Sequence, residues 1–361
     1  MSRTPTGRRG ATLSPRRVTL ADVAEAAGVS RSTASLALSG RGAELRISEA
    51  VQDRIKEAAR ELGYRPNIVS SGLRTGRTMT IGFVSDTVAT SRLAGDMIKG
   101  AIEAARDRGV LLFIGESEGD GKLEHALLQG MHDRQVDGII FASMYTRRIT
   151  VPDALRTTSA VLLNAVPKTA SPLPVVVPDE VEAGRTAARV LLEAGHREGV
   201  HVIGAGPGVR NVPRDSVAAV ERLVGIREVF DAAGAKLAGG VRCGDWQPEE
   251  GFAATRDLLA RTTPRALICL NDRLAFGAYQ ALGDASLSVP DDVSVVSFDD
   301  HPLASWMRPQ LTTVALPHYE LGRRAVDALF GQIDGTPGEG SVHRVPMPLR
   351  TRASVARAEV S

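Results

Sequence analysis

The stretch VTLADVAEAAGVSRSTASLALSG, residues 18–40, predicts two short helices joined by a tight turn. Thr19 is a suitable N-cap for the first helix, and Asp22 follows three residues later in a capping-box arrangement. Apolar residues then recur at the i, i+3, i+4, i+7 spacing of one helical face, and Gly28 ends that helix. Ser30 caps the second helix. A helix, a short glycine-containing turn and a second helix form a helix-turn-helix motif.

A third helix is predicted to begin after Ser48 and to end at Gly63. Residues 1–80 carry 14 Lys and Arg against 7 Asp and Glu, whereas the rest of the chain carries 30 against 35. A basic head on a mildly acidic body indicates that the head meets a polyanion. Two alternatives stay open at this point: a plain three-helix bundle, and a solvated basic tail with no partner.

The segment that follows the third helix predicts a hinge. Pro66 interrupts the chain, and Asn67 can cap a helix of about two turns that contains Gly72 and reaches about Leu73. Such a helix is too short to hold alone in water, so we expect it to form only against a partner. The alternative is a plain linker. The predicted boundaries are a basic tail 1–17, a helix-turn-helix domain 18–65, a hinge and linker 66–78, and a body 79–361.

The body alternates apolar strand patterns with helical ones from Thr80 onwards. This alternation predicts parallel sheets flanked by helices, and the number of strands exceeds one sheet. We therefore expect two similar α/β subdomains. The predicted strands are TIGFVSD (80–86), VLLFIGES (110–117), DGIIFAS (137–143), AVLLNAV (160–166), GVHVIGAG (199–206), RALICLND (265–272) and SVVSFDD (294–300).

Composition and motifs exclude several classes of protein. No stretch approaches the roughly 18 apolar residues of a membrane span, and the N-terminal arginines are not followed by the apolar core of a secretory signal. Two cysteines cannot form a disulfide framework, which fits a reducing cytoplasm. The sequence has no HExxH or CxxC motif, and GAGPG at 204–208 lacks the spacing of a phosphate loop. We expect neither catalysis nor a metal or cofactor.

In order and spacing, seven segments resemble the lac repressor (LacI) family of bacterial transcription regulators, from Val18 to about Arg352. The resemblance implies a DNA-binding head, a hinge, and a periplasmic-binding-protein-like body of two subdomains with a small effector, a sugar or related metabolite, in the cleft between them. It also implies a homodimer that reads a pseudo-palindromic operator. The segments are VTLADVAEAAGVSRSTAS, ELGYRPN, GLRTGRTMTIGFV, LLEAGHREGVHVIGAGP, ERLVGIREVF, LICLNDRLAFGAYQAL and VSVVSFDDHPLASWMRPQLTTV.

In the head, the resemblance implies that the second helix faces base edges in the major groove. Arg31 can donate two hydrogen bonds to guanine. Leu36 departs from the arginine common in the family and offers apolar contact only, so helix packing is an equal alternative for it. By the same resemblance Leu73 would enter the minor groove at the centre of the operator. The predicted DNA-contacting residues are Thr19, Ser30, Arg31, Ser32, Leu36, Ser48, Asn67 and Leu73.

In the body, Asn271 and Asp299 each follow an apolar strand run, at the carboxyl end where α/β sheets bind ligands. Asn164 replaces the acid that is common in the family, and His318 replaces an aromatic residue; a surface histidine is the alternative for the latter. Asp272 and Asp300 fit helix or loop caps better than ligand contacts. The effector-binding residues that the resemblance implies are Asn164, Arg222, Trp246, Asn271, Asp299 and His318.

Three other functions remain as alternatives to a sugar-controlled repressor. One is a regulator of the same fold with a purine-like ligand or another corepressor. A second is a solute-binding protein with the same body, against which the missing signal peptide and the basic head argue. A third is an α/β enzyme, which would need a catalytic constellation that the sequence does not offer.

Overall fold

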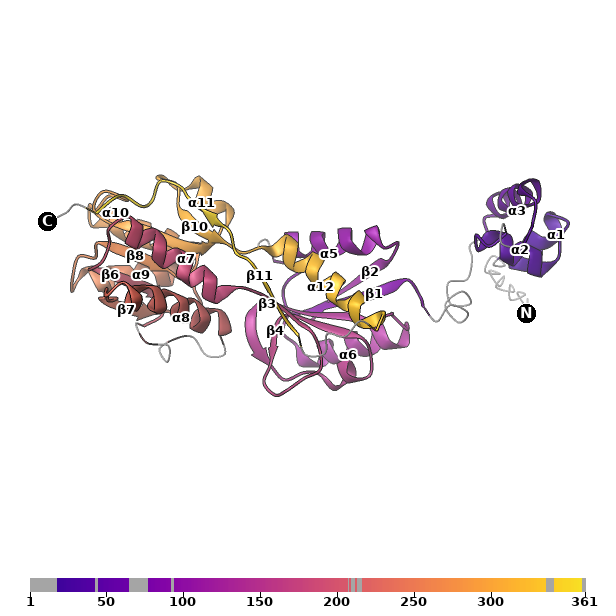
Figure 1. Cartoon of the computed structure of the whole chain (residues 1–361), viewed down its shortest axis with the longest axis horizontal. Coiled ribbons are helices and arrows are strands. Elements are labelled where there is room, and N and C mark those ends of the chain that lie inside the picture. Colours follow the sequence, from indigo (N-terminus) through magenta and orange to yellow (C-terminus); the bar gives the residue numbers. More distant parts are fainter. Residues whose placement is uncertain are drawn as a thin grey trace, which may run out of the picture. The chain divides into compact units, whose positions relative to one another are not determined.

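The computed structural model describes residues 18–42, 45–64, 77–91, 94–206, 208, 212, 216–335 and 341–358 of the 361-residue chain. The chain divides into two compact units, residues 1–78 and 79–361, which we call the head and the body (Figure 1). The predicted tail 1–17, Asn67 and Leu73 lie outside the described residues. No helix in the described part of the chain is long and apolar enough to cross a membrane.

The described residues of the head form three helices, as the sequence predicts: α1 (Leu20–Ala26), α2 (Arg31–Leu38) and α3 (Glu49–Glu61). They enclose a small core built largely of alanine, with Val23 and Ile55 at 0% exposure. Small side chains let the helices cross closely, which is why so short a sequence can bury a core.

Helix caps in the head follow the prediction in two of three places. Thr19 closes a capping box on α1: its backbone N–H donates to Asp22 Oδ2 at 2.7 Å, and its hydroxyl accepts from the Asp22 N–H. Ser30 Oγ accepts from the Thr33 N–H at 3.1 Å. Ser48 occupies the N-cap position of α3, but its side chain makes no capping hydrogen bond. Ser48 therefore holds the predicted cap position without supplying a side-chain cap.

The body holds two six-stranded sheets, one in each of two subdomains, which confirms the predicted α/β architecture. In the N-terminal subdomain the strand order is β11-β5-β4-β3-β1-β2, and every neighbouring pair is parallel. The strands are β1 (Thr80–Ser85), β2 (Leu111–Glu116), β3 (Ile139–Ile149), β4 (Ala160–Pro167), β5 (Val175–Pro178) and β11 (Val342–Val345). Helices α5 (Gly95–Asp107) and α12 (His318–Ile333) cover one face, and α6 (Gly121–Asp133) covers the other (Figure 1).

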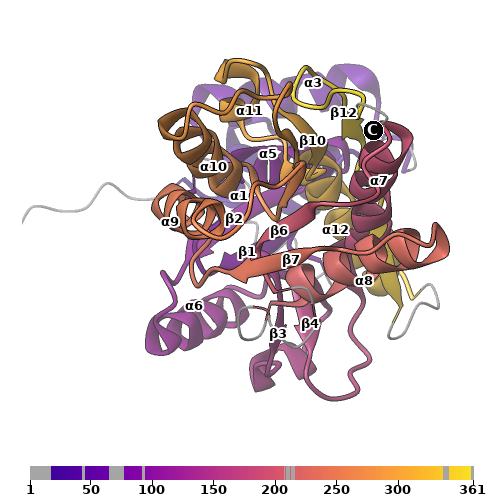
Figure 2. The same ribbon diagram turned by 90° about the vertical axis from the view of Figure 1, so that its left-hand side faces the viewer.

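The C-terminal subdomain repeats this plan with the order β12-β10-β9-β8-β6-β7, in which only the β10–β12 pair is antiparallel. Its strands are β6 (Val200–Gly204), β7 (Gly239–Arg242), β8 (Ala266–Cys269), β9 (Ser294–Asp299), β10 (Thr312–Ala315) and β12 (Leu349–Arg350). Helices α7 (Glu180–Glu193) and α8 (Val217–Ala232) lie on one side of this sheet, and α9 (Pro248–Leu259) and α10 (Asp272–Asp284) on the other (Figure 2). A short helix α11 (Pro302–Trp306) follows β9.

The chain passes between the two subdomains three times: from β5 to α7, from β10 to α12, and from β11 to β12. Each sheet therefore contains strands from distant parts of the sequence. The short strands near these passages were not predicted from the sequence, because two to four residues are too few for an apolar pattern to distinguish a strand from a loop.

Pairs of glycines set the closest helix crossings in the body. At the α7–α8 crossing, a Cβ on Gly184 would lie 2.1 Å from the Arg222 carbonyl oxygen, and a Cβ on Gly225 would lie 1.9 Å from that of Val181. Both distances are far below van der Waals contact, so only glycine fits at either position. The close crossing of α7 and α8 thereby fixes the position of the Arg222 backbone relative to α7.

Candidate functional site

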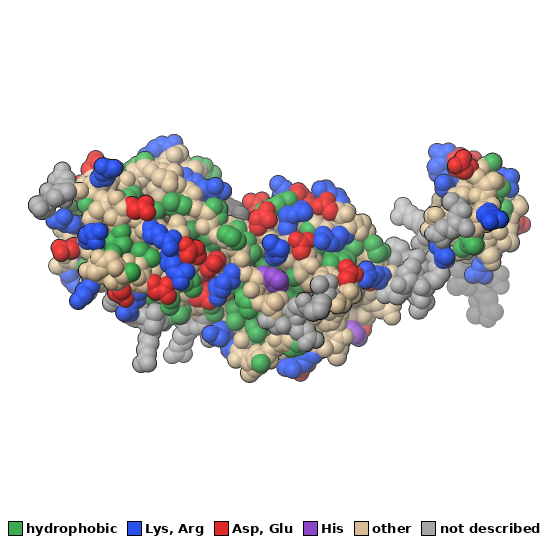
Figure 3. Space-filling view, viewed as in Figure 1, with side chains coloured by type: hydrophobic (Ala, Val, Ile, Leu, Met, Phe, Trp, Pro, Cys, Tyr) green, Lys and Arg blue, Asp and Glu red, His purple; other side chains and the backbone are tan. Residues whose placement is uncertain are grey.

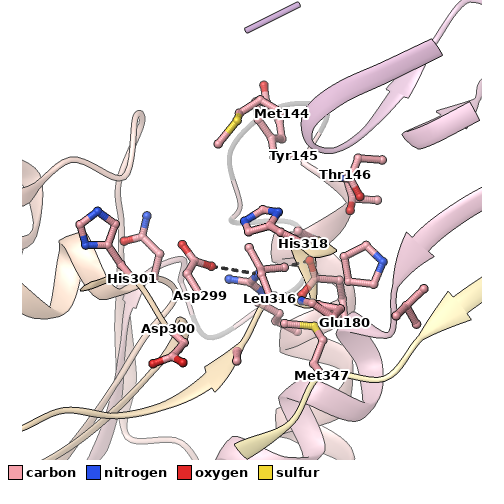
Figure 4. Close-up of a pocket in the computed structure, with 18 of the residues that line it drawn as sticks. Met144, Tyr145, Thr146, Glu180, Asp299, Asp300, His301, Leu316, His318 and Met347 are labelled. Atoms are coloured by element: carbon pink, nitrogen blue, oxygen red, sulfur yellow. Dashed lines mark hydrogen bonds and ion pairs between the residues drawn. The ribbon is translucent and has the colours of Figure 1, made fainter. Parts of the chain in front are cut away.

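A cavity of about 1500 Å³ lies between the two subdomains of the body. All three passages between the subdomains contribute to its lining, through Pro178, Leu316 to His318, and Val345 to Pro348. Figure 4 shows Met144, Tyr145 and Thr146 on one wall, and Asp299, Asp300 and His301 on the opposite one. Because both walls of the cavity belong to different subdomains, a molecule bound here would contact both.

The floor of the cavity carries a buried ion pair. Arg222 Nε donates to Glu180 Oε2 at 2.6 Å, and Nη2 donates to Glu180 Oε1 at 3.2 Å. Nη2 also donates to Asp299 Oδ1 at 3.5 Å (Figure 4). The guanidinium further donates to the Leu270 carbonyl oxygen and lies 4.5 Å from the centre of the Phe298 ring. A buried guanidinium needs such partners, because an uncompensated charge in the interior is very costly.

Asp299 is the acidic group of this floor that faces the cavity. Its side chain is 19% exposed. Burial raises the pKa of Asp299 to about 6, and the nearby Arg222 guanidinium opposes this rise. Asp299 Oδ1 faces Arg222, which leaves the other carboxylate oxygen able to accept hydrogen bonds from a bound molecule.

Strained backbone gathers around the same cavity. Asn164 has a φ of 53°, Trp246 of 54°, Asp299 of 110° and Asp300 of 55°. All four residues line the cavity. Non-glycine residues in this region cost of order 1–3 kcal/mol and persist where the surroundings impose them, most often at ligand sites.

Several residues that line the cavity also carry a buried polar atom without a protein partner. Within the described part of the chain these are Asn164 Oδ1, Thr146 Oγ1, His318 Nδ1 and Arg273 Nε. Burial lowers the pKa of His318 to about 4, so its ring is neutral at pH 7. His318 is half-buried in the cavity wall, and the alternative of a surface histidine is wrong. Each unpartnered atom is costly to leave unpaired, and a hydrogen-bonding ligand would remove that cost.

Two of the predicted contacts, Asn271 and Trp246, are held largely by the protein itself. Asn271 caps α10, with Oδ1 accepting from the Leu274 N–H at 2.8 Å, and its Nδ2 donates to the Trp246 carbonyl oxygen at 3.2 Å. Trp246 Nε1 donates to the Gly204 carbonyl oxygen at 3.1 Å. Asn271 thus positions the Trp246 loop, and the Trp246 ring lines the cavity wall as a flat surface.

All six residues of the predicted effector set line this one cavity. Asp272 and Asp300, which the sequence assigned to caps, have protein partners. Asp272 accepts from the hydroxyls of Ser297 and Thr313, and burial raises the pKa of Asp272 to about 7. Asp300 forms ion pairs with Arg350 and Arg352.

In the head, Arg31 and Ser32 are exposed in the first turn of α2, and Leu36 is half-buried one turn further along the same helix. Arg31 has no ion pair with a described residue, so its guanidinium is available to another molecule. The exposed side chains of α2 therefore form a surface that can meet a partner, as the helix-turn-helix pattern predicts.

Comparison with known proteins agrees with this architecture. Residues 19–67 match the family described as "Bacterial regulatory proteins, lacI family", and residues 188–355 match the "Periplasmic binding protein-like domain". The ribose operon repressor of Escherichia coli (strain K12) is 31% identical over 319 residues, which cover 87% of this chain and 93% of that protein. The chain belongs to the LacI family.

Solved structures of other LacI-family proteins resemble the whole chain. The lac repressor dimer bound to operator and the anti-inducer ONPF gives a TM-score of 0.79 at 26% identity and covers 94% of this chain and 100% of that one. The complex of the transcriptional regulator CelR with cellobiose gives 0.64 at 28% identity, with the same coverage. These likenesses extend over the head and the body alike, so the protein is a DNA-binding transcriptional regulator.

The cavity residues of this LacI-family body that were not predicted from the sequence include Glu180, Thr146 and Arg273. Glu180 follows the apolar run PVVVP and begins a helix, the same position after a strand that drew attention to Asn271 and Asp299. That signal could have identified it. Thr146 lies beyond the predicted end of its strand, because β3 continues to Ile149. Arg273 follows a residue that was assigned to a cap, and its side chain was not considered.

Proposed function

We propose that this protein is a transcriptional repressor whose operator affinity is controlled by a sugar bound in the cavity between the subdomains. The observation that carries the proposal is that four residues lining one cavity, Asn164, Thr146, His318 and Arg273, each hold a buried polar atom without a protein partner. Family relatives support the ligand class, since one is a ribose operon repressor and another binds cellobiose.

The cavity lining suits a polyhydroxylated ligand. Asp299 and Asn164 supply oxygen atoms that accept hydrogen bonds from hydroxyl groups, and Trp246 supplies a flat apolar surface for a sugar ring. Few polar groups in fixed positions within a concave site are the usual basis of small-molecule specificity. The Arg222 guanidinium is not available to donate two parallel hydrogen bonds to the sugar, because its Nε and Nη2 already donate to Glu180.

Control of DNA binding requires that the ligand bind one conformation of the body better than another. Arg344 on β11 and Glu221 on α8 form a bidentate ion pair between the two subdomains, at 2.8 and 2.9 Å. We propose that a change in the angle between the subdomains on ligand binding alters this contact, and that the change is transmitted to the hinge and the DNA-binding heads.

DNA recognition is proposed to need two copies of the chain, because one helix-turn-helix reads only a few base pairs. Strand β2 lies at an edge of its sheet, and Leu111, Phe113 and Ile114 on it and Ile102 on α5 are large exposed apolar side chains. We propose this surface as part of the homodimer interface. A pseudo-palindromic operator would then be read by Arg31, Ser32 and Leu36 of each copy, with phosphates near Thr19, Ser30 and Ser48.

The remaining parts of the proposal concern the hinge, the location and the chemistry. Asn67 would begin a hinge helix and Leu73 would enter the minor groove, which favours a flexible pyrimidine–purine step at the operator centre. Because its partner is bacterial chromosomal DNA, the protein would act in the cytoplasm. It would act by binding alone, without catalysis: for example, burial raises the pKa of the Cys243 thiol to about 12, which leaves it a poor nucleophile.

The proposal is tested by sequencing the genomic DNA that the purified full-length protein retains, with and without a panel of sugars. The expected result is enrichment of a two-fold-symmetric sequence that one class of sugar depletes or increases. Retention of random DNA only, or of the same sequence regardless of every sugar, would contradict it.

A further inference from the structure

Six arginines among the residues that the structure describes line the cavity, and they divide into two groups. Arg222, Arg344 and Arg350 each form an ion pair with a carboxylate. The other three have no ion pair within the described part of the chain: Arg242, Arg273 and Arg324. Arg242 and Arg324 are exposed, as are the lining carboxylates of Asp96, Asp245 and Glu320, so the charges at the mouth offset one another. Arg273 alone of the unpaired arginines is half-buried.

Arg273 stands in a small group of hydrogen-bond donors. Its Nη1 donates to Gln247 Oε1 at 3.2 Å, which leaves the Gln247 amide nitrogen as a donor, and its Nε is buried without an acceptor. His301 Nδ1 accepts from the Leu303 N–H at 3.0 Å, so the neutral ring carries its proton on Nε2. Gln247, Arg273 and His301 all line the cavity. This part of the wall therefore presents N–H groups and one unpaired positive charge.

The opposite part of the site has the reverse character. Asn164 Oδ1 and Thr146 Oγ1, which belong to the N-terminal subdomain, are unpartnered, so this side accepts hydrogen bonds. The Asp299 carboxylate is a further acceptor, on the same wall as His301 and close to Arg273 (Figure 4). The Arg222 guanidinium donates from Nε and Nη2 to the Glu180 carboxylate, so Arg222 is not available to bind an anion. Among the described residues, the donor group around Arg273 is the part of the lining best suited to an anion: Arg273 and His301 are half-buried, and Gln247 is exposed.

We infer that the effector is a sugar that carries an anionic group, a carboxylate or a phosphate, which binds at Arg273, Gln247 and His301 while its hydroxyl groups bind at Asp299, Asn164 and Thr146. The inference rests on the proposed function of the cavity as a sugar site. Charge-assisted hydrogen bonds from a guanidinium to a carboxylate or phosphate are roughly twice as strong as neutral ones, which makes Arg273 the group that selects for charge.

The test is titration calorimetry of the full-length protein with matched triples of pentoses and hexoses: the neutral aldose, its aldonate, and its terminal phosphate ester. The expected result is that an anionic member of one triple binds at least tenfold tighter than its neutral aldose; the aldonate and phosphate arms tell the two anions apart. Arg273→Gln should reduce this preference to less than threefold, whereas Arg242→Gln, at an exposed unpaired arginine, should retain it.

The outcomes separate the inference from the proposed function. A neutral aldose that binds as tightly as its anionic partners, or an Arg273→Gln variant that keeps the preference, would overturn the inference and leave the sugar-controlled repressor intact. Failure of every member of every triple to bind would contradict both. Thermal unfolding of the Arg273→Gln variant is the control. If the variant unfolds at the same temperature as wild type, a lost preference for the anionic sugar is not caused by loss of the fold.

Discussion

Arg222 and Glu180, on helices α8 and α7, form a two-point ion pair whose side chains are 3% and 2% exposed. Removing one partner of such a pair leaves a buried charge without compensation, at a cost of about 3–5 kcal/mol. We expect Glu180→Gln to lower the free energy of unfolding by an amount in this range. Chemical denaturation of the ligand-free protein measures it.

Glu182 provides the matched control for this substitution. It lies two residues further along α7 and pairs with Arg185 and Arg189, but its side chain is 45% exposed. Exposed pairs contribute about 0–1 kcal/mol, so Glu182→Gln should change the stability little. Equal losses in the two variants would show that burial of the Arg222–Glu180 pair does not decide its contribution.

Gly184→Ala tests how the site is positioned. The new Cβ would lie 2.1 Å from the Arg222 carbonyl oxygen, so α7 and α8 must separate. We expect a loss of stability of about 1–3 kcal/mol or more, together with weaker effector binding, because Arg222 and Glu180 move apart. Gly331→Ala on α12 is the control: nothing lies within 4 Å of its Cβ, and alanine there should stabilise by about 0.5–1 kcal/mol. The idea fails if both alanines behave alike in thermal unfolding.

The raised pKa of Asp299 predicts how pH affects effector binding. Since burial raises the pKa of Asp299 to about 6, the folded protein binds more protons than the unfolded chain between about pH 4 and 6, and its carboxyl group is increasingly neutral below pH 6. If the effector hydroxyls require the carboxylate, affinity should fall up to about tenfold for each pH unit below 6.

Asp299→Asn removes the titrating group and keeps an oxygen acceptor. Calorimetry from pH 5 to 8 should then show weaker binding with a flatter pH profile than in wild type. Glu180, Arg222, Asp272 and Arg273 also face this carboxyl group, and all four remain in the variant, so the difference between the profiles isolates Asp299. If wild type and Asp299→Asn show the same pH dependence of effector binding, the group that titrates is not Asp299.

Arg31 offers a test of the head that does not involve the effector. We expect Arg31→Ala to weaken operator binding by about 1–3 kcal/mol and to relax the base preference at one position of each half-site. Lys56→Ala on the exposed side of α3, where Lys56 forms an ion pair with Asp53, should leave the base preference unchanged. Selection of bound sequences with each variant distinguishes base recognition from general attraction to phosphate.

Most of the secondary structure could be predicted from local patterns in the sequence. The capping box at Thr19 and Asp22 and the apolar runs that end at Asn271 and Asp299 depend on neighbours a few residues away, and the structure shows them as predicted. Ser48 holds the N-cap position of α3, but its side chain makes no capping hydrogen bond, which residue type alone does not decide.

Contacts between residues far apart in the sequence could not be predicted from such local patterns. Glu180 and Arg222 are 42 residues apart, and their contact depends on the close crossing of α7 and α8 at Gly184 and Gly225. Nothing in the residue types alone says that a helix-initial acid and an arginine one turn into the next helix will meet. The same holds for the donor group of Gln247, Arg273 and His301, which comes from three separate segments.

The measurement that tests the account most directly is the affinity of the full-length protein for its selected operator, by fluorescence anisotropy, with and without the tightest-binding sugar of the matched triples. We predict that the sugar changes operator affinity of the wild type at least tenfold, and that Asp299→Ala binds the operator as wild type does but no longer responds. Operator affinity that no cavity ligand alters in the wild type, or an Asp299→Ala variant that responds fully, would contradict the account.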